Sequence, residues 1–165
     1  MSKKRKPIYE EYVNHPRYGD KPIHSGNNFS KDEIEQGFWG YSKEHFFPES
    51  VVIANIEKQK YSTFPRTLYV DIKKQCIQCK RSFIFFALEQ KYWYEILGFY
   101  IDADCVKCID CRKKERMIKK MMITYENLLK KEEKTDLEIS ELKKNALELY
   151  QLGYIRNKHK IDKIG

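Results

Sequence analysis

The sequence has 165 residues, of which 41% are hydrophobic and 34% are charged, and its formal net charge is +8. A chain of this size and composition can form one packed domain with a small appendage, and it is too apolar to be wholly disordered. No stretch approaches the roughly 18 consecutive apolar residues of a membrane-spanning helix, and no apolar stretch follows the basic N-terminus as it would in a signal peptide. We therefore expect a cytoplasmic protein that does not cross a membrane.

Residues 1–69 are predicted to form an aromatic-rich N-terminal region that is partly irregular. Prolines and glycines interrupt residues 1–28, which predicts loops and turns there. Ser30 and Glu33 have the spacing of a capping box, which predicts a helix of roughly two turns after Ser30. The apolar run 51–54 fits either a buried strand or the middle of a helix.

The middle of the chain is predicted to contain two strands and a helix. Residues 67–72 alternate between apolar and polar side chains, which predicts a strand with one buried face. Residues 82–86 form a short run that favours a second strand. Residues 88–97 have helical spacing, and Gly98 suits the left-handed position that follows a helix.

Two amphipathic helices are predicted in the C-terminal part, residues 116–165. The first has an apolar stripe between residues 118 and 129, and Thr135 with Glu138 forms a second capping box that begins the next helix. Because the connection between them is short, the two helices should fold back as an antiparallel hairpin. The tail, residues 156–165, is expected to be frayed.

Four of the five cysteines are arranged as two C-x-x-C pairs. Cys76 pairs with Cys79, Cys108 pairs with Cys111, and 28 residues separate the two pairs. Each pair can reach one ion from a single tight turn, and four thiolates at about 2.3 Å satisfy a tetrahedral Zn²⁺ completely. In a cytoplasmic protein this spacing indicates metal ligands rather than disulfides. A closed tetrathiolate site leaves no position for water, which predicts a structural role for the zinc.

Cys105 leaves a second arrangement open. Cys105 and Cys108 are also separated by two residues, so Cys105 could replace Cys108 or Cys111 as a ligand. The Cys108 and Cys111 pairing is preferred, because Cys105 closes an Asp-rich turn at 102–104 rather than opening a knuckle. In that arrangement Cys105 is a spare or packed thiol. A thioredoxin-like redox pair is disfavoured, because no βαβ pattern surrounds either motif.

The cysteine pairs belong to a longer pattern of polar and aromatic residues. The pattern comprises DIKKQCIQC at 71–79, FIFF at 83–86, EQKYWY at 89–94, GF at 98–99 and CIDCRK at 108–113. This segment, roughly residues 70–115, resembles the probable zinc-ribbon domains of bacteria. The resemblance implies a four-cysteine zinc site at Cys76, Cys79, Cys108 and Cys111, and it implies no agreed activity. Lys80 departs from the pattern, because such knuckles often have glycine after the second cysteine.

These elements predict an α+β fold with three parts. An N-terminal region, 1–69, precedes a small four-cysteine zinc ribbon, 70–115, which has short strands and a helix. A C-terminal antiparallel helical hairpin with its tail, 116–165, follows.

Basic residues gather at the start of the helix that follows the last cysteine. Residues 112–165 carry 15 basic and 9 acidic side chains, a net charge of +6. The cluster consists of Arg112, Lys113, Lys114, Arg116, Lys119 and Lys120. At about 100° per residue, Arg112, Arg116 and Lys119 or Lys120 share one face, and Lys113 and Lys114 are expected towards its flanks. Such a surface attracts the phosphates of DNA or RNA, although lysine-rich helix faces are often simply solvated.

Three functions are considered for the chain. The first is a nucleic-acid-binding module, for which exposed aromatics such as Tyr92 or Trp93 are candidates for stacking on bases. The second is an interaction or adaptor protein that binds another protein and whose fold is stabilised by zinc. The third, a hydrolase or nuclease, is disfavoured, because the chain has no P-loop and no hydrolase or metalloprotease motif. The cluster from His15 to Asp20, with His24, fits a turn whose polar groups cap loops better than an active site.

Overall fold

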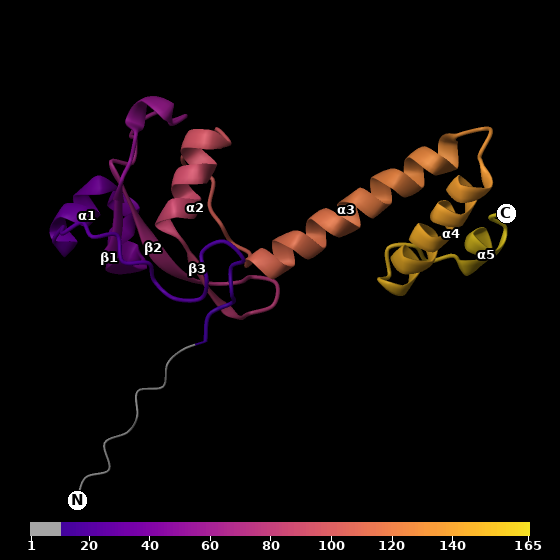
Figure 1. Ribbon diagram of the computed structural model, residues 1–165, viewed down its shortest axis with the longest axis horizontal. Helices are drawn as coiled ribbons and strands as arrows, with labels where there is room; N and C mark the ends of the chain where they lie inside the picture. The colour runs from indigo at the N-terminus through magenta and orange to yellow at the C-terminus, as the bar shows by residue number, and fades with distance from the viewer. Residues whose placement is uncertain (1–10) are drawn as a thin grey trace, which may run out of the picture. The chain divides into compact units, whose positions relative to one another are not determined.

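The computed structural model describes residues 11–165, and the chain divides into two units, Met1–Cys111 and Arg112–Gly165. We call these the first unit and the second unit. The basic N-terminus considered above lies outside the described residues. The first unit combines a three-stranded antiparallel sheet with short helices, and the second unit is helical (Figure 1). The prediction of an α+β fold is therefore confirmed.

The sheet has the strand order β1-β2-β3, with β1 at His45–Ile53, β2 at Leu68–Gln75 and β3 at Ser82–Phe85. The register between β1 and β2 shifts between Phe47 and Val52, which marks a bulge in β1. The run 51–54, which fitted either a strand or a helix, therefore forms the end of β1. The predicted strands at 67–72 and 82–86 correspond to β2 and β3.

The central strand β2 is buried on both faces, so the prediction of a single buried face was wrong. On one face its apolar residues at 68, 70 and 72 pack with residues of α1 and η1. On the other face Tyr69 packs with Ala87 and Tyr94, which belong to α2 and the helical turn after it. In Figure 1, α1 and α2 lie on opposite sides of the strands. A second helical layer thus covers the face that sequence alternation had marked as polar.

The helices of the first unit begin and end at local signals in the sequence. α1 spans Lys31–Gly37, and both hydrogen bonds of the predicted capping box between Ser30 and Glu33 are present. η1 (Trp39–Lys43) and η2 (Ile56–Lys58) are short 3₁₀ helices. α2 (Ala87–Lys91) continues as a π-helical turn, η3 (Tyr92–Ile96), and Gly98 then adopts the predicted left-handed conformation with φ 67°.

Asp71 ties the N-terminal loop and α2 to the central strand. Its Oδ2 accepts a hydrogen bond from the Ile23 amide at 2.9 Å, and its Oδ1 accepts one from the Ala87 amide at 2.7 Å. Its own amide donates to the Ser50 hydroxyl at 2.7 Å. Burial raises the pKa of the Asp71 carboxyl to about 6, although the two amide donors favour the charged form.

This raised pKa predicts that stability depends on the protonation of Asp71. Between the unfolded pKa of about 4 and the folded pKa of about 6, the folded chain holds a proton that the unfolded chain has lost. The free energy of unfolding should therefore fall by about 3 kcal/mol as the pH rises through this window. In an Asp71→Asn variant this part of the fall should be missing. A carboxyl carbon titration by NMR that places the Asp71 midpoint near 4 would contradict the prediction.

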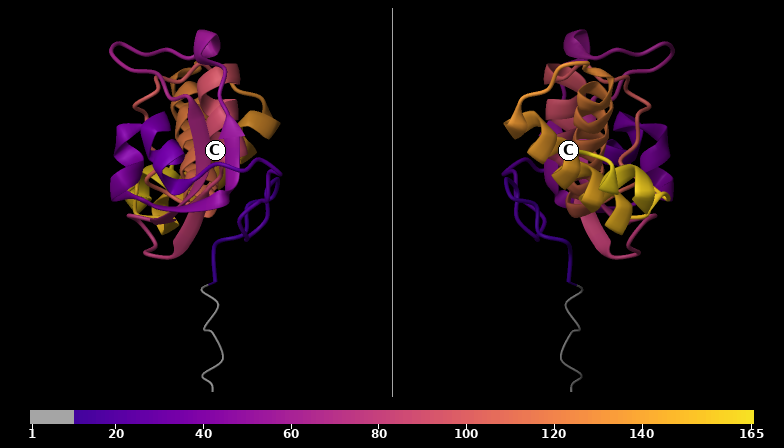
Figure 2. Two further views of the ribbon diagram at one scale, coloured as in Figure 1. Left: turned by 90° about the vertical axis from the view of Figure 1, so that its left-hand side faces the viewer. Right: turned by 90° about the vertical axis from the view of Figure 1, so that its right-hand side faces the viewer.

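The second unit is built from three helices. α3 spans Ile109–Lys130, so it begins in the first unit and continues into the second. α4 spans Asp136–Gln151 and is coloured orange to yellow in Figure 2. Both hydrogen bonds of the capping box between Thr135 and Glu138 are present at the start of α4, which forms the predicted C-terminal helical pair with α3. Within residues 11–165, no helix is long and apolar enough to cross a membrane.

The tail of the chain is more ordered than the sequence suggested. Residues Lys158–Asp162 form a short helix, α5, and the Asn157 side chain caps it by accepting from the His159 amide. Ile161 on this helix is only 1% exposed. The prediction of a frayed tail was wrong here, because burial of one apolar side chain and a side-chain cap hold a segment that local propensity would leave open.

Candidate metal centre

The four cysteines of the two C-x-x-C pairs come together in the structure. The Sγ atoms of Cys76, Cys79, Cys108 and Cys111 all lie within 4.8 Å of one another. Three of the four are buried and Cys79 is half-buried. The first pair lies in the turn between β2 and β3, and the second pair lies at the beginning of α3. Residues far apart in the sequence therefore form one compact set of sulfur donors.

The turn that carries Cys76 and Cys79 is held by its own backbone. The Cys76 amide donates to the Arg81 carbonyl oxygen, and the Lys80 amide donates to the Cys76 carbonyl oxygen, both at 2.9 Å. Lys80 adopts a left-handed conformation with φ 64°. This is the position at which a glycine was expected, and the turn forms with lysine there. The Lys80 ammonium also donates to the Ile77 carbonyl oxygen at 2.8 Å, which helps to hold the turn.

The distances between sulfurs fit a metal ion better than a disulfide. Cys79 Sγ and Cys108 Sγ, which belong to different pairs, are 3.7 Å apart. A disulfide would bring the sulfurs to about 2.05 Å. In a tetrahedral site with bonds of about 2.3 Å, neighbouring sulfurs are about 3.8 Å apart. The donor set, four sulfurs without a carboxylate, is of the kind that soft or borderline metal ions prefer.

The protonation of the cysteines also favours a bound cation. Burial opposes ionisation of Cys76, but backbone amides of Cys79, Cys108 and Gln78 donate to its sulfur and together lower its pKa. Burial raises the pKa of Cys111, and the neighbouring thiols raise it further. Without a cation, the four sulfurs do not all ionise near neutral pH. A divalent ion at their centre supplies the positive charge that allows four thiolates to lie side by side.

Arg81 links the two cysteine pairs from outside the cluster. Its backbone amide and its guanidinium donate to Cys79 Sγ and lower the pKa of that thiol. Its Nη2 also lies 2.8 Å from Asp110 Oδ2, and Asp110 stands between Cys108 and Cys111 in the sequence. Both side chains are more than half exposed, so the ion pair contributes little stability by itself. Its effect is to orient the two turns, and no local sequence pattern indicates it, because the two residues are 29 positions apart.

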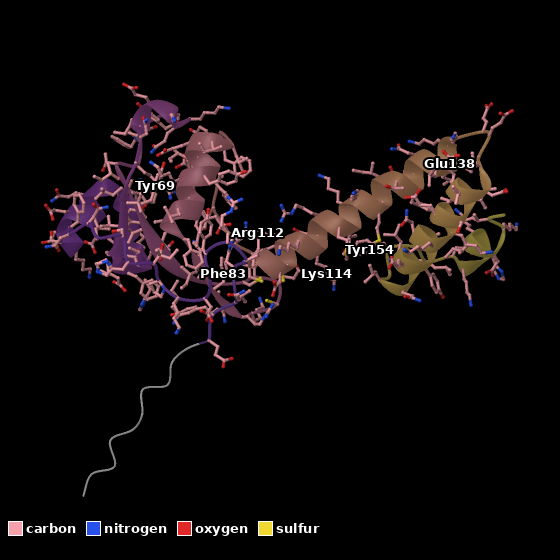
Figure 3. The ribbon with its side chains drawn as sticks, viewed as in Figure 1. Tyr69, Phe83, Arg112, Lys114, Glu138 and Tyr154 are labelled. Atoms are coloured by element: carbon pink, nitrogen blue, oxygen red, sulfur yellow. The ribbon has the colours of Figure 1, made fainter. Side chains whose placement is uncertain are left out.

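Cys105 lies outside the cluster. The set of mutually close sulfurs contains Cys108 and Cys111, whereas Cys105 is buried and its sulfur donates to the Lys107 carbonyl oxygen at 3.4 Å. The arrangement is the one that the sequence analysis preferred. Cys105 joins the same apolar cluster as the four clustered cysteines, together with Phe83, which Figure 3 labels.

This geometry predicts different results for two conservative substitutions. Cys108→Ser should lower the metal content well below one ion per chain, because one donor of the tetrahedron is lost. Cys105→Ser should leave the metal content unchanged, because that sulfur lies outside the cluster. Elemental analysis of both purified variants beside the wild type measures this. Loss of metal from the Cys105→Ser variant would favour the alternative ligand set.

The histidines of the N-terminal loop are engaged in holding that loop. His15 and Gly19 exchange two backbone hydrogen bonds, and His15 Nδ1 accepts from the Arg17 amide at 3.1 Å. His15 Nε2 lies 3.4 Å from the buried carboxylate of Glu89. His24 Nδ1 accepts from the Gly26 amide at 3.1 Å. These contacts match the loop-capping interpretation of the His15 to Asp20 segment.

The two aromatic candidates for base stacking differ in their surroundings. Trp93 packs against the rings of Phe85 and Phe99, with centroid distances of 5.0 and 5.3 Å. Tyr92 is exposed, and the Arg17 guanidinium lies 5.2 Å from its ring centroid. Of the two, only Tyr92 presents a ring at the surface of the first unit.

Comparison with known families identifies the cysteine segment. Residues 70–120 match a family described as the probable treble clef domain. This range contains all four clustered cysteines and the beginning of α3, so the similarity to a treble clef domain covers the whole cysteine cluster. The expected resemblance to a four-cysteine zinc-binding family is confirmed. No curated protein and no solved structure matches the chain.

Proposed function

We propose that the cysteine cluster holds one Zn²⁺ and that this ion has a structural role. The observation that carries the proposal is the set of four sulfurs within 4.8 Å of one another. Zinc accepts four thiolates in a tetrahedron, and such a site has no open position for a substrate or a water. The ion would crosslink the turn after β2 to the beginning of α3 and would not act as a reactive centre. Elemental analysis and competition with a chromogenic chelator test the identity of the metal and its affinity.

The residues around the cluster explain what the ion would stabilise. The cysteines pack with Val13, with Phe83 and Phe85 of β3, and with Ile109 at the start of α3. These side chains come from three separate segments and form only a small apolar cluster. Crosslinking the turn after β2 to the start of α3 holds these segments against one another.

We further propose that the chain binds nucleic acid through one face of α3. We define the basic face as Arg112, Lys113, Arg116, Lys119 and Lys120. At about 100° per residue, these five cations lie within an arc of about 120° on the helix. Four of them are exposed and Arg112 is half-buried. A row of cations on one side of a helix can follow the phosphates of a nucleic-acid backbone, which is what supports this proposal.

Lys114 does not belong to the basic face. The same helical geometry places it about 160° from the centre of the arc, on the side of the apolar stripe. Figure 3 labels Arg112 and Lys114, which lie on opposite sides of α3. The expectation that Lys114 flanks the other cations is therefore corrected. This placement makes Lys114 a natural control for experiments on the basic face.

Titration of the intact chain with labelled single- and double-stranded oligonucleotides tests the proposal. If all five cations contact phosphates of a duplex, the slope of log affinity against log salt approaches about −4.5. Absence of binding at about 50 mM salt would overturn the nucleic-acid proposal, because electrostatic binding is strong at low salt. In that case an acidic protein surface becomes the candidate partner of the same cations.

A further inference from the structure

Arg66 is a buried arginine in the first unit, and the side chain of Gln59 holds its backbone in place. The residue is only 7% exposed. Its amide donates to Gln59 Oε1 at 3.0 Å, and Gln59 Nε2 donates back to the Arg66 carbonyl oxygen at 2.7 Å. The same Nε2 donates to the hydroxyl of Tyr69, which Figure 3 labels in the interior of this unit. These hydrogen bonds hold the backbone at Arg66 in place.

Aromatic rings approach the faces of the guanidinium. Its central carbon lies 3.9 Å from the ring centroid of Phe38 and 5.2 Å from that of Tyr94. Such contacts offset part of the cost of burying a cation. They act on the flat faces, however, and the N–H groups of a guanidinium point outward in its plane. One of these donors meets the Tyr41 hydroxyl, which forms a hydrogen bond with the Arg66 side chain. The Nε–H, in contrast, has no acceptor among the described residues.

The described part of the chain provides no anion for this cation. Among residues 11–165, no acidic side chain forms an ion pair with Arg66, and its buried Nε–H meets no acceptor. The hydroxyls of Tyr41 and Tyr94, which interact with the Arg66 charge, cannot supply the negative charge. Burial raises the pKa of both Tyr41 and Tyr94, and the Arg66 charge opposes this rise without reversing it, so both stay neutral near pH 7.

A buried charge without a partner is costly, so buried arginines are normally paired with an anion. We infer that Arg66 binds a phosphate group at the edge of its guanidinium. The planar fork of donors matches the oxygens of a phosphate in a bidentate contact. The phosphate binds the terminal N–H groups and supplies the negative charge that the described residues lack. The assignment concerns the first unit alone and does not depend on the basic face of α3.

The surface next to Arg66 suits the rest of a nucleotide. Phe38, which stacks on Arg66, also contacts the ring of Trp39, with a centroid distance of 5.4 Å. Trp39 is 65% exposed, and the Lys43 ammonium lies 5.4 Å from its ring centroid. An exposed indole can stack on a base, and a second cation can approach another phosphate. The phosphate is either free phosphate or part of a nucleotide, and a comparison of phosphate with adenosine monophosphate distinguishes the two.

Thermal unfolding of the full chain in phosphate, at constant ionic strength, tests this site. A ligand that binds only the folded state raises the Tm with increasing concentration. We expect a saturating rise in the wild type and a loss of phosphate affinity of about ten- to hundredfold in Arg66→Met, because charged hydrogen bonds are removed. Arg17→Met is the matched control, since Arg17 also lies over a ring but is exposed, and it should retain the rise.

Adenosine monophosphate serves as the second probe. If adenosine monophosphate raises the Tm more than phosphate does, and Trp39→Ala reduces this rise to the level seen with phosphate, the ligand is a nucleotide. If both probes raise the Tm equally, the ligand is free phosphate. Arg66→Lys keeps the charge without the fork and should bind more weakly than the wild type, which provides a second variant if Arg66→Met does not fold. No phosphate-dependent rise in the wild type, or the same rise in Arg66→Met, would overturn the inference.

Discussion

Removal of the metal with a chelator at neutral pH should unfold the cysteine segment, residues 71–111, and spare the helices at residues 116–151. Structural zinc contributes about 10 kcal/mol or more to the folding of small domains that it crosslinks. The apolar cluster around the cysteines is small and draws on separate segments of the chain. The second unit contains no cysteine, and α4 carries its own capping box. Hydrogen exchange with and without chelator measures protection of the two segments separately.

Two controls make this first prediction specific. Adding Zn²⁺ back should restore protection in residues 71–111, and a Cys76→Ser variant should lack that protection without any chelator. Cys105→Ser should behave as the wild type, because its sulfur lies outside the cluster. If the chelator reduced protection equally along the whole described chain, the ion would stabilise both units together and the prediction would fail.

Reversing three charges of the basic face should strongly weaken nucleic-acid binding while the metal content stays intact. In the triple variant Arg112→Glu, Lys113→Glu and Arg116→Glu, three attractive contacts become repulsive. Each phosphate contact contributes about 0.7 to 0.9 to the salt slope, so the slope should fall by about 2 to 3. We expect affinity at about 50 mM salt to drop at least a hundredfold, because contacts to the phosphate backbone supply most of the affinity. Fluorescence anisotropy with labelled oligonucleotides measures both quantities.

The chain offers a matched pair of lysines for this second prediction. Lys113 and Lys114 are adjacent and both exposed, but only Lys113 belongs to the basic face. Lys113→Glu should weaken binding about tenfold, whereas Lys114→Glu changes the net charge equally and should have a clearly smaller effect. Equal losses in the two variants would show that net charge, rather than one helix face, determines binding.

The features that the sequence determined by itself depend on residues close together in the chain. The two C-x-x-C spacings identified the four cysteines of the cluster, because two thiols separated by two residues can share one ion from a single turn. The capping boxes at Ser30 and Thr135 could also be predicted from the sequence, since each places a donor and an acceptor three residues apart. Gly98 adopts a left-handed conformation after a helix, as its position predicts.

The features that only the tertiary structure decided depend on segments brought together by folding. Burial of β2 on both faces required a second helical layer, which alternation within one strand does not encode. The contact of Arg81 with Asp110 joins residues 29 positions apart, and the order of the tail depends on burial of Ile161. The packing of the Arg66 guanidinium against the rings of Phe38 and Tyr94, with no anionic partner among residues 11–165, likewise depends on folding. Helix capping and the pairing of the cysteines follow from the spacing of residues along the chain. Burial and contacts between distant residues depend instead on which surfaces meet when the chain folds.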